Sequence, residues 1–260
     1  MKTSNSRTKA FAFWGAAFVL LIALMFTACP NNAGGETPYV QVPYGELRSY
    51  LKGASADKVN YIEVTGPIPK DDFKNTGAVS RLGNTINRYP RKVALKITYP
   101  SDLTDMGYCF YECTNLISLA NLPASKITNM DSCFANCEEL TSVPNIPADV
   151  ENISSCFAGC KKLTTGPDIP ASVTSMHMCF NGCTKLTRVR LKCDYSSATI
   201  SGGRKAFADA FKDCIALTDG SIKVPAAYYD SYTDPAALTT MQVPGADTAA
   251  QKAKFAAYNP

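Results

Sequence analysis

The sequence repeats a five-residue cysteine motif at nearly constant intervals, and this periodicity limits the folds open to the chain. The motif reads CFYEC, CFANC, CFAGC and CFNGC, with copies beginning at Cys109, Cys133, Cys156 and Cys179, which are 24, 23 and 23 residues apart. A fifth copy, AFKDC, begins at Ala210 and carries alanine in place of the first cysteine. Such self-similarity is typical of repeat proteins, in which each repeat buries its apolar side only against its neighbours.

Other features recur with the motif. A proline-containing phrase precedes the first four copies, and a leucine follows each copy by three residues. The apolar positions within one repeat are mostly three or four residues apart. This spacing is too irregular for one long helix, and the run of apolar positions is too long for one strand. A coil that turns corners would place these positions inward and stack them on the next coil. The leucines are Leu116, Leu140, Leu163, Leu186 and Leu217.

These repeats resemble a known family. Units of about 23 residues with a Phe-x-x-Cys-x-x-Leu core and phrases such as IPASVTSM resemble the BspA-type leucine-rich repeats of bacterial surface proteins, in particular cysteine-rich lipoproteins of spirochaetes. The resemblance covers residues 99–225. It implies an α/β repeat solenoid, a right-handed coil like that of leucine-rich repeats. A parallel sheet would run along one face, with one short strand after each leucine.

The segments that flank the repeats, which span residues 101–225, are predicted to cap them, because a repeat array must cover its apolar ends. Residues 39–100 contain VNYIEVTG and RKVALKITYP, which are typical of strands, and GELRSYLKG and VSRLGNTINRY, which have helical spacing. The predicted order of this cap is helix, strand, helix, strand. Residues 226–260 are predicted to form a helical cap from PAAYYDSY and AAQKAKFAAY.

The start of the chain predicts export and attachment to a membrane. Residues 1–28 carry three basic side chains ahead of an uncharged run, which is typical of an export signal. The run ends in FTAC, which resembles the lipobox of bacterial lipoproteins, although Phe26 stands where leucine is usual. By this resemblance Cys29 would be acylated after cleavage. An uncleaved membrane anchor is the alternative.

Residues 29–38 lack apolar periodicity and are predicted to be a flexible tether. Together, the signal and the tether predict a lipid-anchored protein of the cell envelope, exposed on the surface of the outer membrane. Whether it faces outward or toward the periplasm is left open.

Charge argues against nucleic acid as a partner. The chain has 26 basic and 22 acidic side chains, and the first 28 residues hold three of the basic ones and no acidic ones. The remaining 23 and 22 nearly cancel, so there is no basic footprint for nucleic acid. The expected membrane contact is through the N-terminal lipid alone.

The paired cysteines leave three interpretations open. Buried thiols are favoured, because free cysteine is among the most buried residue types. Disulfides between equivalent cysteines of adjacent coils are possible, since stacked coils approach to roughly 5 Å. A zinc site is disfavoured because Ala210 would remove a ligand. We therefore expect neither a metal nor another cofactor.

Enzyme chemistry has little support in the sequence, and no catalytic residue is assigned. His177 is the only histidine, and neither a nucleophile motif nor a phosphate-binding loop accompanies it. We interpret His177 as an exposed, incidental side chain.

The predicted function is binding. By resemblance, members of the family adhere to host proteins or to other bacteria, so the expected partner is a host or bacterial surface protein or glycan. An envelope spacer without a specific ligand and a thiol-based metal-binding or redox module are the alternatives. The candidate binding face consists of the polar residues between the inward positions of the strands. These are Ser118, Asn121, Ser142, Asn145, Thr165, Asp168, Arg188 and Arg190.

Acylation at Cys29 can be tested by metabolic labelling. Radiolabelled palmitate should enter the wild-type protein and should not enter Cys29→Ala, because the lipobox cysteine is the acceptor. Equal labelling of both proteins would remove the lipoprotein interpretation.

Overall fold

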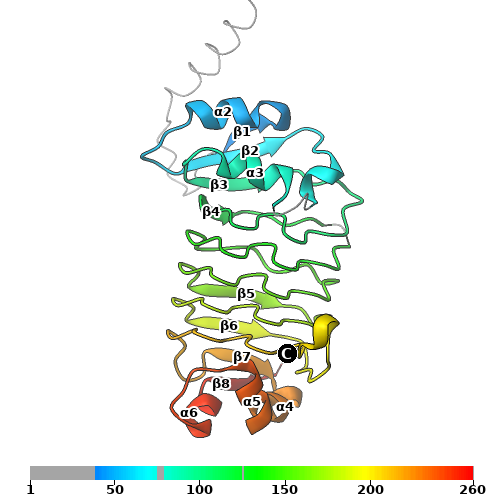
Figure 1. Cartoon of the computed structure of the whole chain (residues 1–260), viewed down its shortest axis with the longest axis vertical. Helices are drawn as coiled ribbons and strands as arrows, with labels where there is room; N and C mark the ends of the chain where they lie inside the picture. The colour runs from blue at the N-terminus through cyan, green and yellow to red at the C-terminus, as the bar shows by residue number, and fades with distance from the viewer. Residues whose placement is uncertain (1–38, 75–78, 125, 260) are drawn as a thin grey trace, which may run out of the picture. The chain divides into compact units, whose positions relative to one another are not determined.

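The computed structural model describes residues 39–74, 79–124 and 126–259, which belong to one compact unit, Tyr39–Pro260. Within this unit successive coils of the chain stack on one another, with most of the helices in its first and last parts (Figure 1). The predictions for residues 1–38, Cys29 among them, lie outside the described residues. Across the described ranges, none of the helices has the length and apolarity that a membrane span requires.

The first four strands form a parallel sheet in the order β1-β2-β3-β4. Residues 39–100 were expected to begin with a helix, and the structure adds β1 before it. The strands are β1 (Val40–Pro43), β2 (Asn60–Thr65), β3 (Val93–Ile97) and β4 (Leu116–Leu119). The connections contain the 3₁₀ turns η1 (Tyr44–Glu46) and η2 (Lys70–Phe73) and the helices α2 (Leu47–Gly53) and α3 (Arg81–Asn87).

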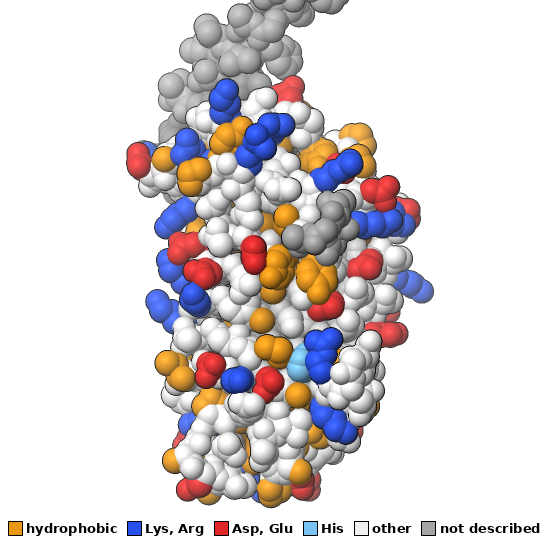
Figure 2. Space-filling view, viewed as in Figure 1, with side chains coloured by type: hydrophobic (Ala, Val, Ile, Leu, Met, Phe, Trp, Pro, Cys, Tyr) orange, Lys and Arg blue, Asp and Glu red, His pale blue; other side chains and the backbone are white. Residues whose placement is uncertain are grey.

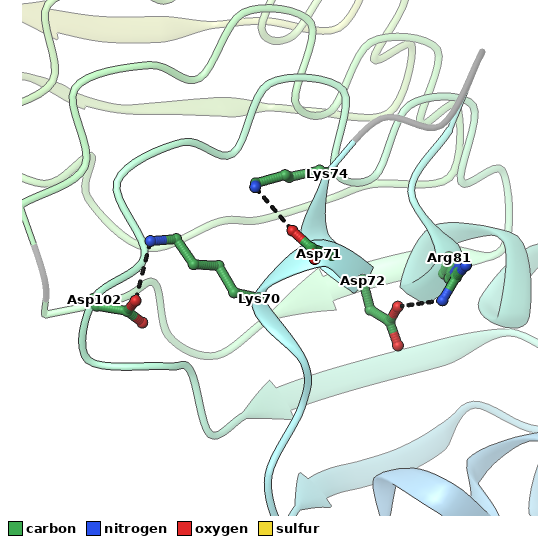
Figure 3. Close-up of polar contacts among 6 residues, drawn as sticks. All are labelled: Lys70, Asp71, Asp72, Lys74, Arg81 and Asp102. Atoms are coloured by element: carbon green, nitrogen blue, oxygen red, sulfur yellow. Dashed lines mark hydrogen bonds and ion pairs between the residues drawn. The ribbon is translucent and has the colours of Figure 1, made fainter.

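Ion pairs hold η2 against its neighbours (Figure 3). Lys70 lies 3.0 Å from the Asp102 carboxylate at the start of the repeats, and Arg81 of α3 lies 3.3 Å from Asp72. Asp72 is buried and also accepts a 2.8 Å hydrogen bond from the Tyr44 hydroxyl. Burial and this bond to Asp72 raise the pKa of Tyr44 well above its usual value. A buried carboxylate with two partners thus fixes the connection between β2 and β3.

The last four strands form a second parallel sheet in the order β5-β6-β7-β8. They are β5 (Thr165–Ile169), β6 (Arg188–Leu191), β7 (Ile222–Pro225) and β8 (Phe255–Tyr258). The repeat after Leu140 has no such strand. Its one pairing of this kind is an isolated bridge between Ser118 and Ser142.

The expectation of one unbroken sheet is therefore wrong. Proline explains the interruption, because it has no N–H to donate to a strand ladder. Pro144 occupies the position where the second repeat would pair, and Pro167 lies inside β5. The register of β5 against β6 shifts between Thr165 and Asp168, on either side of Pro167.

Residues 226–260 contain helices and a strand, whereas helices alone were expected. The strand β8 covers the second half of AAQKAKFAAY, and it pairs with β7. Phe255 is buried and its ring stacks on Tyr232 at 5.9 Å, so tertiary packing overrides the local helical preference. The helical elements are η4 (Ala226–Tyr228), α4 (Tyr229–Thr233), α5 (Pro235–Met241) and α6 (Thr248–Ala253).

A second ladder, separate from the strands, joins the repeats just before each cysteine motif. Parallel bridges connect Asp105 to Asn129, Asn129 to Asn152, and Asn152 to Ser175. The Asn129 side-chain amide donates to Asp105 Oδ1 at 2.9 Å, and the Asn152 amide donates to Asn129 Oδ1 at 3.1 Å. Each coil is thereby hydrogen-bonded to the next on a segment far from its strand in sequence.

The core of the repeats is a column of stacked phenylalanine rings. Neighbouring ring centroids are 5.4 to 5.8 Å apart, and the ring planes differ by no more than 10°. All of these side chains are fully buried. They are Phe110, Phe134, Phe157, Phe180 and Phe211.

Each cysteine motif turns through the left-handed region of backbone space just before its second cysteine. The φ angle there is +59° at Asn136, +72° at Gly159 and +73° at Gly182. Glycine and asparagine tolerate this conformation best. This favours the asparagine and glycines at three of the five motifs, whereas Glu112 and Asp213 adopt the same region in the first and last.

Replacing Phe157 by alanine should lower the free energy of unfolding by about 3 to 5 kcal/mol, because it empties the middle of the ring column. Urea denaturation followed by circular dichroism measures the change. Thr164→Ala, at an exposed position in the same repeat, is the control and should stay within about 0.5 kcal/mol of wild type. A loss of that small size at Phe157 would contradict the assigned core.

Candidate functional site

The eight polar residues predicted to form a binding face lie on or next to β4, β5 and β6 and the repeat between them. We call this set the strand face. Register pairs Thr165 with Arg188 and Asp168 with Arg190 on adjacent strands. Ser118 and Ser142 are joined by the isolated bridge, as described above. Pairs from adjacent repeats therefore lie side by side.

The two asparagines of the strand face bond the backbone of a neighbouring coil. Asn121 accepts a hydrogen bond from the Ile97 N–H at 2.9 Å and donates to the Ile97 carbonyl at 2.8 Å. Asn145 Oδ1 accepts from the Asp168 N–H at 3.1 Å. Backbone bridging explains why an amide stands at this position in both repeats. The exposed residues of the face are Ser142, Asn145, Thr165, Arg188 and Arg190.

Positive charge is concentrated at β6 and β7. Arg188, Arg190 and Lys192 are exposed on or beside β6, and Lys223 is the register partner of Arg190 on β7. We call these four residues the basic patch. Asp168 is the acidic group beside it, 3.0 Å from the Lys192 ammonium and 3.7 Å from the Arg190 guanidinium.

Sequence reasoning missed three contributors to this region. Lys192 and Lys223 flank the predicted face, and Tyr258 lies under the Arg190 guanidinium, 5.2 Å from the ring centroid to Cζ. Tyr258 belongs to β8, a segment expected to be helical. The alternating pattern IKVP of β7 could have indicated that Lys223 faces the same way as Arg190.

The electrostatic character of the face changes along the stack. In the first sheet, Lys96 lies 3.0 Å from Glu63 on the neighbouring strand, so charges there are matched. In the second sheet, four basic side chains lie on or beside β6 and β7, and two of them, Arg190 and Lys192, pair with Asp168. Arginine binds carboxylates and sulfates through paired, charge-assisted hydrogen bonds. The β6–β7 end is therefore suited to a partner with acidic groups.

The cysteines after residue 39 are buried and free, as the burial interpretation predicts. The second cysteine of a motif donates its S–H to the phenylalanine carbonyl of the preceding coil. Cys137 reaches the Phe110 oxygen at 3.0 Å, and Cys160 reaches the Phe134 oxygen at 3.1 Å. Each of these carbonyls thereby gains a buried donor from the next repeat.

Burial also governs the chemistry of the thiols. It raises the pKa of Cys193 to about 11 and that of Cys214 to about 12, so both stay protonated at neutral pH. Metal ligands and nucleophiles require the thiolate. Among the described residues, no group of three or more metal-ligating side chains is brought together. These thiols act as packing groups and hydrogen-bond donors.

The interpretation of His177 as an exposed side chain is wrong. It is 6% exposed, and its Nδ1 is buried without a hydrogen-bond partner. It occupies the position of Asp131 and Ser154 in the preceding repeats.

One family is matched when the sequence is compared with family models. The BspA type leucine rich repeat region matches residues 104–233 in six copies. The match extends past the five copies of the cysteine motif to the end of α4. Neither a curated protein nor a solved structure matches the chain.

The buried thiols predict that the protein loses stability at alkaline pH. The pKa of each thiol is raised in the folded state, so its contribution is fully present below about pH 9 and is lost as the pH rises toward 11 to 12. Above pH 9 the free energy of unfolding should fall by about 1.4 kcal/mol per thiol and per pH unit.

Urea titrations at several pH values from 8 to 11 measure this slope. Cys214→Ala should make the slope shallower by one thiol, while buried tyrosines such as Tyr232 contribute equally to both proteins. The same slope in wild type and variant would contradict burial of the Cys214 thiol. Maleimide should correspondingly label the repeat cysteines only after denaturation.

Proposed function

Since the chain belongs to the BspA-type leucine-rich repeat family, we propose that it is a non-enzymatic protein of the cell envelope that binds a partner protein through its strand face. The coarser part of this statement, a repeat protein of a protein-interaction family, follows from the family itself. The partner, the surface location and the adhesin-like role are the proposal.

The basic patch is the observation that carries the proposal. Arg190 and Lys223 are register partners on adjacent strands, and like charges at such positions destabilise a sheet. Burial of an acidic group between them would relieve the repulsion. The patch is also prearranged, because the Tyr258 ring and Asp168 hold the Arg190 guanidinium. A preorganised cation loses less entropy on binding.

The proposal also assigns a role to the rest of the chain. The coils would form a right-handed solenoid capped by residues 39–100 and 226–260. A lipid at Cys29 and a tether at residues 29–38 would place the array at a distance from the outer membrane, with the strand face available to partners on host or bacterial cells.

The alternatives predict different behaviour. An envelope spacer would show no specific ligand, so the basic patch would be dispensable. A glycan-binding face would favour sulfated over neutral glycans, because the patch is cationic. A thiol-based metal or redox module is the least favoured, given the protonated, buried thiols.

The basic patch can be tested by neutralising it. Surface plasmon resonance would measure binding of the purified protein to a panel of acidic and basic extracellular proteins, with a sulfated glycan as a separate arm. Arg188→Gln with Arg190→Gln should weaken binding to the acidic proteins about tenfold or more, because charge-assisted hydrogen bonds are lost. The melting temperature should change little.

The matched control is Lys161→Gln with Lys162→Gln, which removes the same charge elsewhere. These lysines pair with Glu138 at 2.8 Å and Glu139 at 2.5 Å, and exposed ion pairs contribute little to stability. Equal binding by both variants and wild type would reject the strand face. Binding to none of the proteins would favour the spacer.

A further inference from the structure

A polar cavity of about 320 Å³ lies beside the second ladder and shares no residue with the strand face. One wall is the insertion of the fourth repeat, which leaves after β6 and returns at Lys205. Thr199 and Lys205 form an antiparallel bridge, and the Ile200 N–H donates to the Arg204 carbonyl at 2.7 Å. The turn between them contains η3 (Ser201–Gly203). The insertion thus places Ile200, Ser201 and Arg204 over the repeats.

The repeats contribute a column of side chains from one position in three successive coils. Asp131, Ser154 and His177 occupy this position, and backbone hydrogen bonds join their coils directly. Hydrogen-bonded coils repeat at about 4.8 Å, so the column spans about 10 Å. Tyr108 of the first coil adds an aromatic surface to the lining. The column is therefore long enough to contact a ring-sized ligand, well beyond a single water molecule.

His177 is the group in this cavity that lacks a partner. The residue is buried, and no described residue bonds its Nδ1. Burial, and then the nearby Arg204 guanidinium, lower the pKa of His177 below its usual value, so the ring is neutral at pH 7. Nδ1 itself is shielded from the cavity, so His177 contributes the other atoms of its ring to the lining. Figure 2 shows this histidine, the single pale blue side chain of the sequence, next to a basic side chain.

The two charged side chains of the lining can also form hydrogen bonds with a ligand. Within the described ranges, neither Asp131 nor Arg204 forms an ion pair, although each influences the other electrostatically. Asp131 accepts a 2.9 Å hydrogen bond from Ser132, which leaves further acceptor positions on its carboxylate. Arg204 offers donors only. The cavity thus combines an acceptor, a donor and hydroxyls, with charges that cancel.

We propose that this cavity binds one neutral, polyhydroxylated ring, a sugar unit of a glycan, with Asp131 and Arg204 as its hydrogen-bonding partners and His177 in the wall beside it. Each sugar hydroxyl both donates and accepts, so a set of them satisfies the Asp131 carboxylate and the Arg204 guanidinium together. The volume lies at the lower end of the range of about 300 to 1,000 Å³ for small-ligand sites, which suits one ring. The apolar surfaces of Tyr108 and Ile200 give the C–H face of the ring a place to pack. This proposal does not rest on the function proposed for the strand face.

Two other uses of the cavity fit less well. A catalytic triad needs histidine between the serine and the carboxylate, whereas Ser154 lies between Asp131 and His177 and bonds Ser175 at 2.7 Å. An anion would be attracted by Arg204 but repelled by the Asp131 carboxylate. A neutral ligand avoids this repulsion.

The single histidine makes the test direct. Nitrogen-15 NMR of the full chain reports one imidazole, because the sequence contains one histidine. Galactose, glucose, mannose and N-acetylglucosamine are the probes, with glucuronate, glycine and inorganic phosphate as anionic and zwitterionic comparisons. At least one neutral sugar should shift the His177 signals saturably, with a roughly millimolar dissociation constant. Asp131→Asn and Arg204→Gln should each weaken that binding about tenfold.

The exposed Lys185, which is outside the lining, provides the control Lys185→Gln, and this variant should bind like wild type. Melting temperatures within about 2 °C of wild type would show that the variants remain folded. No shift with any neutral sugar would overturn the proposal and leave a cavity filled by water. Shifts with phosphate, glucuronate or glycine alone would assign a charged ligand and overturn it too. Sugar binding that survives in both Asp131→Asn and Arg204→Gln would overturn the proposal as well.

Discussion

The contact between one repeat's second cysteine and the preceding repeat's phenylalanine carbonyl is the constraint on which the array depends. Cys183 and Cys214 each donate an S–H to such a carbonyl at 3.0 Å, beside the stacked rings. The fifth motif keeps Cys214 but has Ala210 in place of the first cysteine. The two cysteines are therefore not equivalent, since one mainly fills space and the other also satisfies a buried acceptor.

The repeat core could be predicted because each repeat contains the same pattern of apolar residues. The inward leucines, phenylalanines and cysteines are all buried in the structure. Contacts between segments that are distant in the sequence could not be predicted from the local pattern. Phe255 becomes part of a strand because β7 offers an edge and Tyr232 a ring to pack on. His177 is buried beside a cavity that the insertion also lines, and the local pattern of neither segment indicates the other.

For the strand face, the sequence indicated which positions lie between inward residues, but not which were already engaged. Asn121 bridges two coils through both of its amide atoms, whereas Arg188 contacts Thr165 and stays exposed. A repeat fold separates these roles: backbone geometry holds each position in place, and substitution from coil to coil changes its chemistry. Asp131, Ser154 and His177 illustrate this, as three different side chains at one position of the coil.

The interrupted strand pairing affects how the array would respond to a pulling force. Around Pro144 and Pro167 the strand pairing is reduced to an isolated bridge on one side and a shifted register on the other. The phenylalanine rings and the second ladder continue across this place, so the folded array holds together there through side chains and a single row of backbone bonds. Six backbone hydrogen bonds cross from the coil of Pro144 to the next, including those donated by Met130, Ser132 and Phe134. A tensile load on the array would therefore fall on the second ladder and the side chains between the sheets, and on strand pairs as well within the second sheet.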